Sequence, residues 1–434
     1  MASFAHATRS FAAANATGDI TVAGFGPVKA AIIMATAGPT NQANGSIAFY
    51  TAAEGAKANG VASQGVSAAT SNTGSQKKNN VGIVIPQNSN GFSQVEYTVA
   101  AITDGLRFTK VAANTGGQPI QVQCIFFAGD DIQVALREVS ATGGSITGLG
   151  FQPNMAIATS VGRGVGDASG SQSSICFGAI TDNSVGITQG ATFSVGRSGL
   201  TTTSSLAMAA NDKFCGELAS NATPLWTVSH TAFGAGNGGE HTWANPSGTA
   251  DAMFILYLRF ASDSFGMVPI TWPNVLGTWT VNTLHFTPDL IIGAGVDPCQ
   301  AYSSTAASTT NTYAHNFFLA DADSSGAVGW AEEDAQAGTD CANTNIFSPT
   351  TLQFLASDTA TRPRIDAVTL TPGGWEANVT FAAAFRPFIG FGLGFAAGAA
   401  GTFNIFRGSD NVAAMKLGAA NIDAAYVGAT KVFG

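Results

Sequence analysis

Charged residues are scarce in this chain. Only 10% of its 434 residues are Asp, Glu, Lys or Arg, and the formal net charge is −9. A protein that binds a nucleic-acid backbone needs a basic stripe to displace counterions, so that class is excluded. The one tight basic pair, Lys77-Lys78, lies in a stretch rich in Ser, Asn and Gly, and we expect it on a solvated loop.

Cysteine is also scarce. Five Cys without a C-x-x-C spacing exclude a disulfide framework. Cys176 could pair with Cys215, and Cys299 with Cys341, which leaves Cys124 alone on an apolar strand. The odd count and irregular spacing favour buried, reduced thiols in a chain folded in a reducing cytoplasm.

The sequence begins without the long apolar run that characterises a secretion signal. Residues 1–9 lack the apolar core of a secretion signal, so none is expected. One uncharged stretch, 387–406, has the length of a membrane helix. Within it, however, three Gly alternate with Phe391, Leu393 and Phe395, and this period of two predicts a strand with one bare and one apolar face.

The chain is instead rich in Gly (52 residues) and Phe (29), and 45% of it is hydrophobic. Few Lys and Glu beside many Thr, Val and Ile predict an all-β chain with Gly-rich turns. So much hydrophobic sequence argues against disorder, and the length suits about three ordinary domains.

One pattern occurs three times: Gly, alternating strand formers, Phe-x-Pro, and a run of small and branched apolar residues. The Phe of the three copies is Phe25, Phe151 and Phe286. Successive copies are therefore 126 and 135 positions apart. Pro removes a donor from a sheet ladder, so we expect a strand, a corner and a second, more buried strand in each copy.

A strongly apolar strand, preceded by a shorter polar one, follows each copy. The apolar strands are expected at 121–127, 253–260 and 377–385, and the polar ones at 105–109, 240–243 and 366–370. We therefore predict three tandem β-sandwich domains of the jelly-roll or lectin-like kind, arranged like beads on a string. The predicted parts are an N-terminal arm at 1–17, repeats at 18–138, 139–273 and 274–395, and a Gly/Ala linker with a short C-terminal β-hairpin at 396–434.

Three local predictions follow from turn residues and core content. Glu54 to Asn80 holds few core residues and is expected to be an exposed excursion. Hairpins are predicted at 176–188 and 316–330, and a third at the C-terminus with Gly428 in its turn.

One set of acids matches the pattern of a calcium loop. Its members fall at loop positions one, three, five, six and twelve, where oxygen ligands can wrap a hard cation: Asp321, Asp323, Ser325, Gly326 and Glu332. No amphipathic helices flank the loop, and a polar hairpin turn is the alternative.

The five His show no metal-ligand spacing. His230 and His241 share the second repeat with Cys176 and Cys215, so a zinc site could assemble there, although ordinary sheet residues are the favoured interpretation.

The remaining motifs predict no site. Residues 234–239 match G-x-G-x-x-G, but a strand-like stretch follows, so we expect a flexible loop. There is no P-loop and no G-x-S-x-G elbow, and the acids at 332–334 are interpreted as a solvated face rather than a glycosidase pair. We therefore assign no catalytic, cofactor-binding or metal-binding residue.

Tryptophan could serve a β-sandwich in two ways, as exposed platforms for glycans or as core, and core is favoured. The six residues are Trp226, Trp243, Trp272, Trp279, Trp330 and Trp375.

Two kinds of segment resemble phage sequences. Residues 146–155 and 286–292 resemble the GLGF-x-PDLVWIK repeat of structural proteins of tailed bacteriophages. Residues 422–432 resemble the I-x-x-V-Y-V-G-x-T-x-V ending of phage minor tail proteins and fibres. The first copy departs from the repeat at 26–29, and the Trp-Ile-Lys ending is absent.

The resemblance implies a non-enzymatic virion component, made in a bacterial cytoplasm and used in many copies. We expect a tail-associated or fibre protein that acts in assembly and host attachment, contacting copies of itself and other virion proteins, with Gly390 to Phe395 as a candidate docking strand. A capsid decoration protein, a glycan-binding adhesin and a depolymerase are the alternatives.

Overall fold

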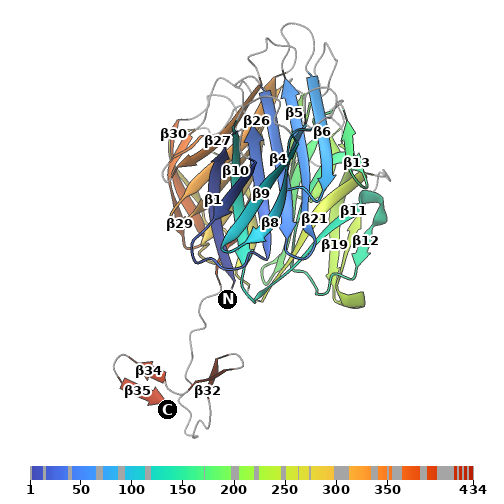
Figure 1. The fold of residues 1–434 in the computed structure, drawn as a ribbon. Coiled ribbons are helices and arrows are strands. Elements are labelled where there is room, and N and C mark those ends of the chain that lie inside the picture. The colour runs from blue at the N-terminus through green and yellow to red at the C-terminus, as the bar shows by residue number, and fades with distance from the viewer. Residues whose placement is uncertain are drawn as a thin grey trace. The chain divides into compact units, whose positions relative to one another are not determined.

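In the computed structural model the chain is built almost entirely of antiparallel β-sheets (Figure 1), which confirms the all-β prediction. Met1–Gly398 form one compact unit, and Ala399–Gly434 form a second, smaller one. The structure describes the chain except for residues 1, 13–15, 38–41, 65–71, 87–92, 113–118, 171, 197–204, 219–223, 246–250, 262, 273–274, 298–311, 334–340, 349–350, 354–363, 382–388, 398–414, 418–419, 423–424, 428–429 and 434.

The larger unit contains three successive pairs of sheets, each a large sheet and a four-stranded sheet. The first pair contains β1 (Ser3–Phe11), β2 (Thr17–Thr21), β3 (Ala30–Ala37), β4 (Gln42–Thr51), β5 (Gly55–Gln64), β6 (Asn72–Asn79), β7 (Ile83–Pro86), β8 (Ser93–Ile102), β9 (Gly105–Ala112) and β10 (Ile120–Ala128). The second contains β11 (Ile132–Ser140), β12 (Ser145–Thr147), β13 (Met155–Gly164), β15 (Ile175–Asn183), β16 (Gly186–Val195), β17 (Leu206–Ala210), β18 (Cys215–Leu218), β19 (Pro224–Gly234), β20 (Glu240–Ala244) and β21 (Asp251–Phe260). The third contains β22 (Phe265–Thr271), β23 (Gly277–Val281), β24 (Leu290–Asp297), β25 (Thr312–Asp321), β26 (Ser325–Glu333), β27 (Cys341–Ser348), β28 (Thr351–Gln353), β29 (Arg364–Thr371), β30 (Gly374–Phe381) and β31 (Ile389–Phe395).

The three pairs share one strand order. The large sheets run β1-β10-β3-β4-β5-β6, β11-β21-β13-β15-β16-β17 and β22-β31-β24-β25-β26-β27, and the small sheets β2-β9-β8-β7, β12-β20-β19-β18 and β23-β30-β29-β28. The first large sheet has a seventh strand, β14 (Ala168–Gly170), beside β6. The corner residues Phe25, Phe151 and Phe286 all lie between the second and third strands of their segment, each half-buried on the core between its own two sheets.

Each segment begins earlier in the chain than the repeat boundaries predicted from the sequence. Residues 3–11 of the expected N-terminal arm are β1, which pairs along its length with β10. The boundary after residue 138 cuts through β11, and β22 precedes the boundary after 273. In every case the opening strand lies beside the closing strand of its own segment, but it comes before the corner motif from which the boundaries were counted.

The apolar strand predicted at 377–385 is wrong for the last segment. Residues 377–381 lie in β30 of the small sheet, and the strand equivalent to β10 and β21 is β31. The apolar side chains of β31 face one way, while Gly392 lies where a Cβ would be 2.4 Å from the Trp375 ring. Both faces of β31 are therefore buried, and the expected docking strand lies inside the sheet between β22 and β24.

The Glu54 to Asn80 segment is also not an exposed excursion, because β5 and β6 fall within it and belong to the first large sheet. The two predicted internal hairpins are present as β15–β16 and β25–β26. The smaller unit contains β32 (Met415–Leu417) paired with β33 (Ala420–Ile422), and β34 (Ala425–Val427) paired with β35 (Thr430–Phe433), which are the strands of the expected C-terminal hairpin.

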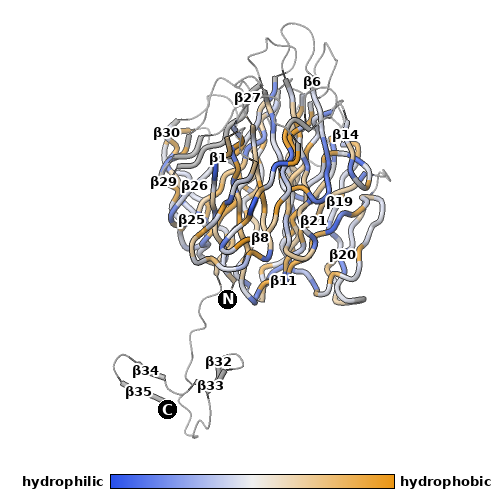
Figure 2. The backbone as a smooth tube through the Cα atoms, in the orientation of Figure 1, coloured by the Kyte–Doolittle hydropathy of each residue, from blue (hydrophilic) through white to orange (hydrophobic). Residues whose placement is uncertain are grey.

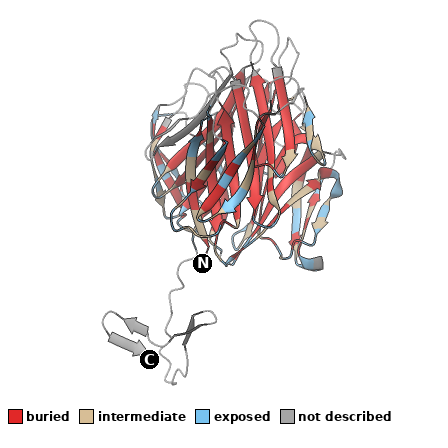
Figure 3. Cartoon of the chain, viewed as in Figure 1, coloured by how far each residue is buried: buried red, intermediate tan, exposed pale blue. Residues whose placement is uncertain are grey.

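The three pairs of sheets are not separate beads, because a fourth core joins them. Each pair has its own core between its sheets, but one further apolar cluster takes side chains from all three large sheets, including Met34, Ile157 and Ile292. The third strands β3 and β24 are consequently buried on both faces. Figure 2 shows apolar positions recurring along the strands, and Figure 3 shows their burial. We call this cluster the shared core.

Phenylalanines from the three segments meet in the shared core. The Phe4 ring lies 5.8 Å from that of Phe127, 5.9 Å from Phe260 and 5.5 Å from Phe395. Phe4 belongs to the first segment, Phe260 to the second and Phe395 to the third, so residues 1–398 depend on one another for burial.

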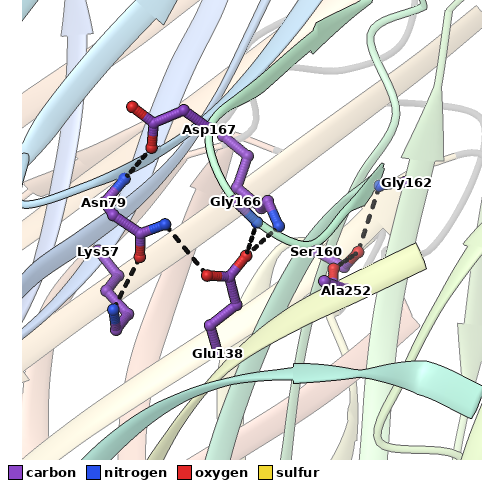
Figure 4. A network of polar contacts seen from close by, with 9 residues as sticks. Lys57, Asn79, Glu138, Ser160, Gly162, Gly166, Asp167 and Ala252 are labelled. Atoms are coloured by element: carbon purple, nitrogen blue, oxygen red, sulfur yellow. Dashed lines mark hydrogen bonds and ion pairs between the residues drawn. The ribbon is translucent and has the colours of Figure 1, made fainter. Parts of the chain in front are cut away.

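Polar contacts accompany the shared core where two segments meet. Between the first and second, Lys77 is fully buried and forms an ion pair with Glu138. Glu138 also accepts hydrogen bonds from Asn79 Nδ2 (3.0 Å) and Gly166 N (2.6 Å), as Figure 4 shows. The prediction of a solvated Lys77 is thus wrong: it lies in β6, which pairs with β14 (Ala168–Gly170), and its ammonium group lies 5.4 Å from the centre of the Phe254 ring in β21.

The other two junctions use histidine. Between the second and third segments, the buried His315 ring lies 2.9 Å from Thr192 Oγ1 and 3.1 Å from Ser194 Oγ. Between the first and third, His6 Nδ1 lies 3.3 Å from Ser324 Oγ and its Nε2 lies 3.3 Å from Gln123 Oε1.

Candidate functional site

A pocket of about 390 Å³ opens in the second segment. Its lining combines charged, polar and apolar groups: Gly162, Arg163, Ser169, Gly170, Gln172, Glu217, Leu225 and Asp251. We call it the carboxyl pocket.

An irregularity in β13 builds one wall of the carboxyl pocket. The register of β13 against β21 shifts between Thr159 and Arg163. Ser160 Oγ holds the irregular stretch, donating to the Ala252 carbonyl (3.0 Å) and accepting from Gly162 N (3.2 Å) (Figure 4). After β13 the chain leaves the second large sheet and forms β14, which pairs with the edge of the first large sheet. Ser169 and Gly170 of β14 thereby line the rim of the carboxyl pocket.

Two carboxyl groups meet beneath this wall. Glu217 in β18 is paired in register with Trp226 in β19, and Asp251 begins β21. The Trp226 indole Nε1 donates to both, at 3.2 Å to Glu217 Oε2 and 3.0 Å to Asp251 Oδ2. The Glu217 and Asp251 carboxyl groups thus share one donor, the Trp226 indole N–H.

Electrostatics favours a proton on Glu217 near neutral pH. Burial raises the pKa of Glu217 to about 7, the negative charge of Asp251 adds to the rise, and Arg163 opposes it. Glu217 therefore keeps a proton at pH values where an exposed Glu would be ionised.

Glycine is required at two places in this wall. At Gly162 (φ +61°) a Cβ would lie 2.0 Å from the Glu217 carboxyl group, and at Gly170 it would lie 1.9 Å from Arg163 Nη2. The backbone at these two glycines is thus packed directly against Glu217 and Arg163 and limits the positions of their side chains.

The arrangement suits binding better than glycoside cleavage. Glycosidases hold their two carboxyl groups about 5–9.5 Å apart, which leaves room for the sugar bond and a water. Glu217 Oε2 and Asp251 Oδ2 instead accept from the same donor, the Trp226 Nε1–H group. What the carboxyl pocket offers is a cluster of acceptors beside the guanidinium of Arg163, whose buried Nε has no hydrogen-bond partner among the described residues.

Sequence reasoning missed these residues because no motif links them. Arg163, Glu217 and Asp251 lie on three strands that are far apart in the chain. The one available signal was Glu217 itself, an acid within the short apolar stretch Cys215-Gly216-Glu217-Leu218.

The calcium loop is not formed. Ser325 to Glu333 are strand β26, so Glu332 lies seven residues along an extended strand from Ser325, about 23 Å at the usual rise. Asp321 caps the turn, accepting hydrogen bonds from the backbone N–H groups of Asp323 (3.0 Å) and Ser324 (2.7 Å). The polar hairpin turn is therefore the correct alternative, and the buried Glu332 rules out a solvated face there.

The candidate zinc ligands come together as two separate pairs. His230 Nδ1 lies 3.2 Å from His241 Nε2, and His241 Nδ1 lies 3.0 Å from Tyr257 Oη. Burial lowers the pKa of His230 to about 4. Cys176 and Cys215 are buried free thiols in contact with each other. Within the described residues, no three His, Cys, Asp or Glu side chains are grouped so as to hold a metal ion.

Cys124 is likewise a buried free thiol, whereas the side chains of Cys299 and Cys341 lie outside the described part of the structure. All six Trp are less than 10% exposed, so none forms a surface platform for glycans. The segment 234–239 joins β19 to β20 through the short 3-10 helix η2 (Gly236–Gly238).

The described residues contain no helix with the length and apolar character of a membrane span. No family model, no curated protein and no solved structure matches the chain.

Proposed function

We propose that this chain is a non-enzymatic structural component of a tailed-phage virion, tail-associated or part of a fibre, that acts in assembly and host attachment. The observation that carries the proposal is the shared core. Three sandwiches of one strand order bury the faces of their large sheets against one another within a single chain.

Such a body suits a particle component for a physical reason. Strands buried on both faces cannot slip by one residue without moving apolar side chains to the wrong side, so the register of the large sheets is strongly specified. Among the described residues Cys124, Cys176 and Cys215 are free thiols, so the burial of apolar side chains holds the large sheets together.

Assembly contacts would then use exposed apolar side chains rather than the Phe-rich strands, which are internal. Val185 (72% exposed) and Ile187 (55%) lie at the β15–β16 turn, and Val275 (66%) and Leu276 (68%) precede β23. Contiguous exposed apolar groups mark protein contact sites, so these two short stretches are our candidates.

Immunogold electron microscopy of particles from the source culture tests the proposal. An antibody raised against the purified chain should label intact particles, at the tail for the favoured role or at the head for a decoration protein. Particles that carry no label, with the antibody shown to recognise the chain on a blot, would contradict a virion role.

A further inference from the structure

We propose that the carboxyl pocket binds a saccharide, holding two neighbouring hydroxyl groups of one sugar ring between Arg163 and the Glu217–Asp251 pair. The inference extends the attachment part of the proposed function, but it depends only on the pocket itself.

The mixture of charges selects the class of ligand. Arg163 and Asp251 place opposite charges in the same pocket, so a simple cation or anion would be attracted by one of them and repelled by the other. A hydroxyl group is neutral and can donate one hydrogen bond while it accepts another. Two adjacent hydroxyl groups can therefore donate to the carboxyl oxygens and accept from the guanidinium at the same time.

The rest of the lining fits the remainder of a sugar ring. Ser169 and Gln172 add hydroxyl and amide groups at the rim, and Leu225, which is 45% exposed, offers an apolar surface for C–H groups. The volume of about 390 Å³ lies within the range of small-molecule sites, about 300–1,000 Å³.

The pocket is also held in place before any ligand arrives. Gly162 and Gly170 press the backbone against Glu217 and Arg163, and the Trp226 N–H fixes both carboxyl groups. The β14 excursion that forms the rim is tied to the body of the second segment through Glu138, which accepts from Gly166 N, and to the first segment through Asp167, which accepts from Asn79 N at 2.7 Å. A preformed site of this kind loses little entropy on binding.

Saturation-transfer NMR on the full chain tests the inference with five sugars at millimolar concentration: D-glucose, D-galactose, D-mannose, L-rhamnose and N-acetylglucosamine. We expect at least one to bind the wild-type protein. Asp251→Asn keeps the shape of the side chain but removes its charge, and should weaken binding about tenfold or more, the factor for losing a hydrogen bond to a charged group. Arg163→Lys keeps the charge but loses the planar fork, and should also weaken binding.

Asp212→Asn is the matched control, because Asp212 is an exposed Asp of the same segment, paired with Lys213 outside the pocket. It should bind as the wild type does, and equal melting temperatures would show that the variants are folded. The inference is overturned if none of the five sugars binds, if Asp251→Asn binds as tightly as the wild type, or if the site takes Ca²⁺ in calorimetry and no sugar. These outcomes leave the immunogold result untouched, so the two proposals can fail separately.

Discussion

The first and second segments meet through an ion pair, whereas the second and third meet through a neutral imidazole. Lys77 and Glu138 carry opposite charges, and Lys77 has no exposed surface. His315 is equally buried, but burial lowers its pKa to about 3, so it stays uncharged between two hydroxyl groups. The same shared core is thus joined by two kinds of polar contact, and they should fail under different conditions.

The two junctions are sensitive to different changes. The ion pair is disturbed when one of its two residues is replaced, and the imidazole is disturbed when the pH falls. Burial lowers the pKa of Lys77, and its contact with Glu138 opposes that shift. Burial alone would raise the pKa of Glu138, but hydrogen bonds from Lys77, Gly166 and Asn79 lower it overall. Both members therefore keep their charges at neutral pH, and the cost appears only when one of them is removed. The neutral imidazole is disturbed by acid alone, since protonation would bury an unpaired charge.

Lys77→Met should give the largest effect, a loss of about 3–5 kcal/mol in the free energy of unfolding, because it leaves the Glu138 carboxylate without its buried counter-charge. Urea denaturation followed by circular dichroism measures the loss. Adding Glu138→Gln to the same chain should recover part of it.

Lys78→Met is the matched control for this change. Lys78 is partly exposed and lies 3.8 Å from Glu96 and 3.9 Å from Asp167, so its loss should cost no more than about 1 kcal/mol. Equal costs for the two lysines would contradict the difference drawn between the junctions.

Lowering the pH should reduce the free energy of unfolding through His315, by an amount between those of the other two predictions. The folded pKa of His315, about 3, lies below the unfolded value of 6.5, so between these values the unfolded chain binds the extra proton and the stability falls as the pH falls. From pH 6.5 to pH 5 this amounts to about 2 kcal/mol for this one residue. In His315→Gln, urea denaturation at several pH values should show a shallower dependence, by about 1.4 kcal/mol per pH unit.

The control here is His285→Gln, which replaces an exposed histidine. If His315→Gln and the wild type show the same slope, the neutral imidazole is not the source of acid sensitivity. The histidine at the junction of the first and third segments should behave similarly, because burial lowers the pKa of His6 to about 4 even though Asp321 opposes the shift.

The smallest effect is expected from the neutral contact that accompanies the ion pair. Asn59 Nδ2 donates to Thr159 Oγ1 across the first junction at 3.4 Å, and both side chains are buried. Thr159→Val removes the acceptor and should cost about 1 kcal/mol in urea denaturation. Thr98→Val, which removes an exposed contact to the Thr109 carbonyl, should cost less. A Thr159→Val loss as large as that of Lys77→Met would show that the charge itself is unimportant at this junction.

Local features of the fold could be predicted from the sequence because they depend on neighbouring residues. The hairpins β15–β16 and β25–β26 follow from turn residues between strand formers, and the corners at Phe25, Phe151 and Phe286 follow from a Pro that ends one strand before the next begins. The opening strands of the segments could not be assigned in this way, because their partners are the closing strands about 100 residues later.

The carboxyl pocket lay beyond prediction for the same reason. Arg163, Glu217 and Asp251 meet only after β13, β18 and β21 are brought together, and nothing in their spacing marks them. The calcium pattern shows the converse error: five residues with the right spacing were separated by a strand that kept them extended.

The all-β class and the three Phe-x-Pro corners could be read from the amino-acid sequence, because alternation and turn chemistry act over a few residues. The folded structure was needed to show what the second face of each large sheet is buried against, that Lys77 is enclosed, and that Trp226 donates to two carboxyl groups. The physical reason is that burial and desolvation depend on which strands meet, and strands distant in the chain meet only in the folded molecule.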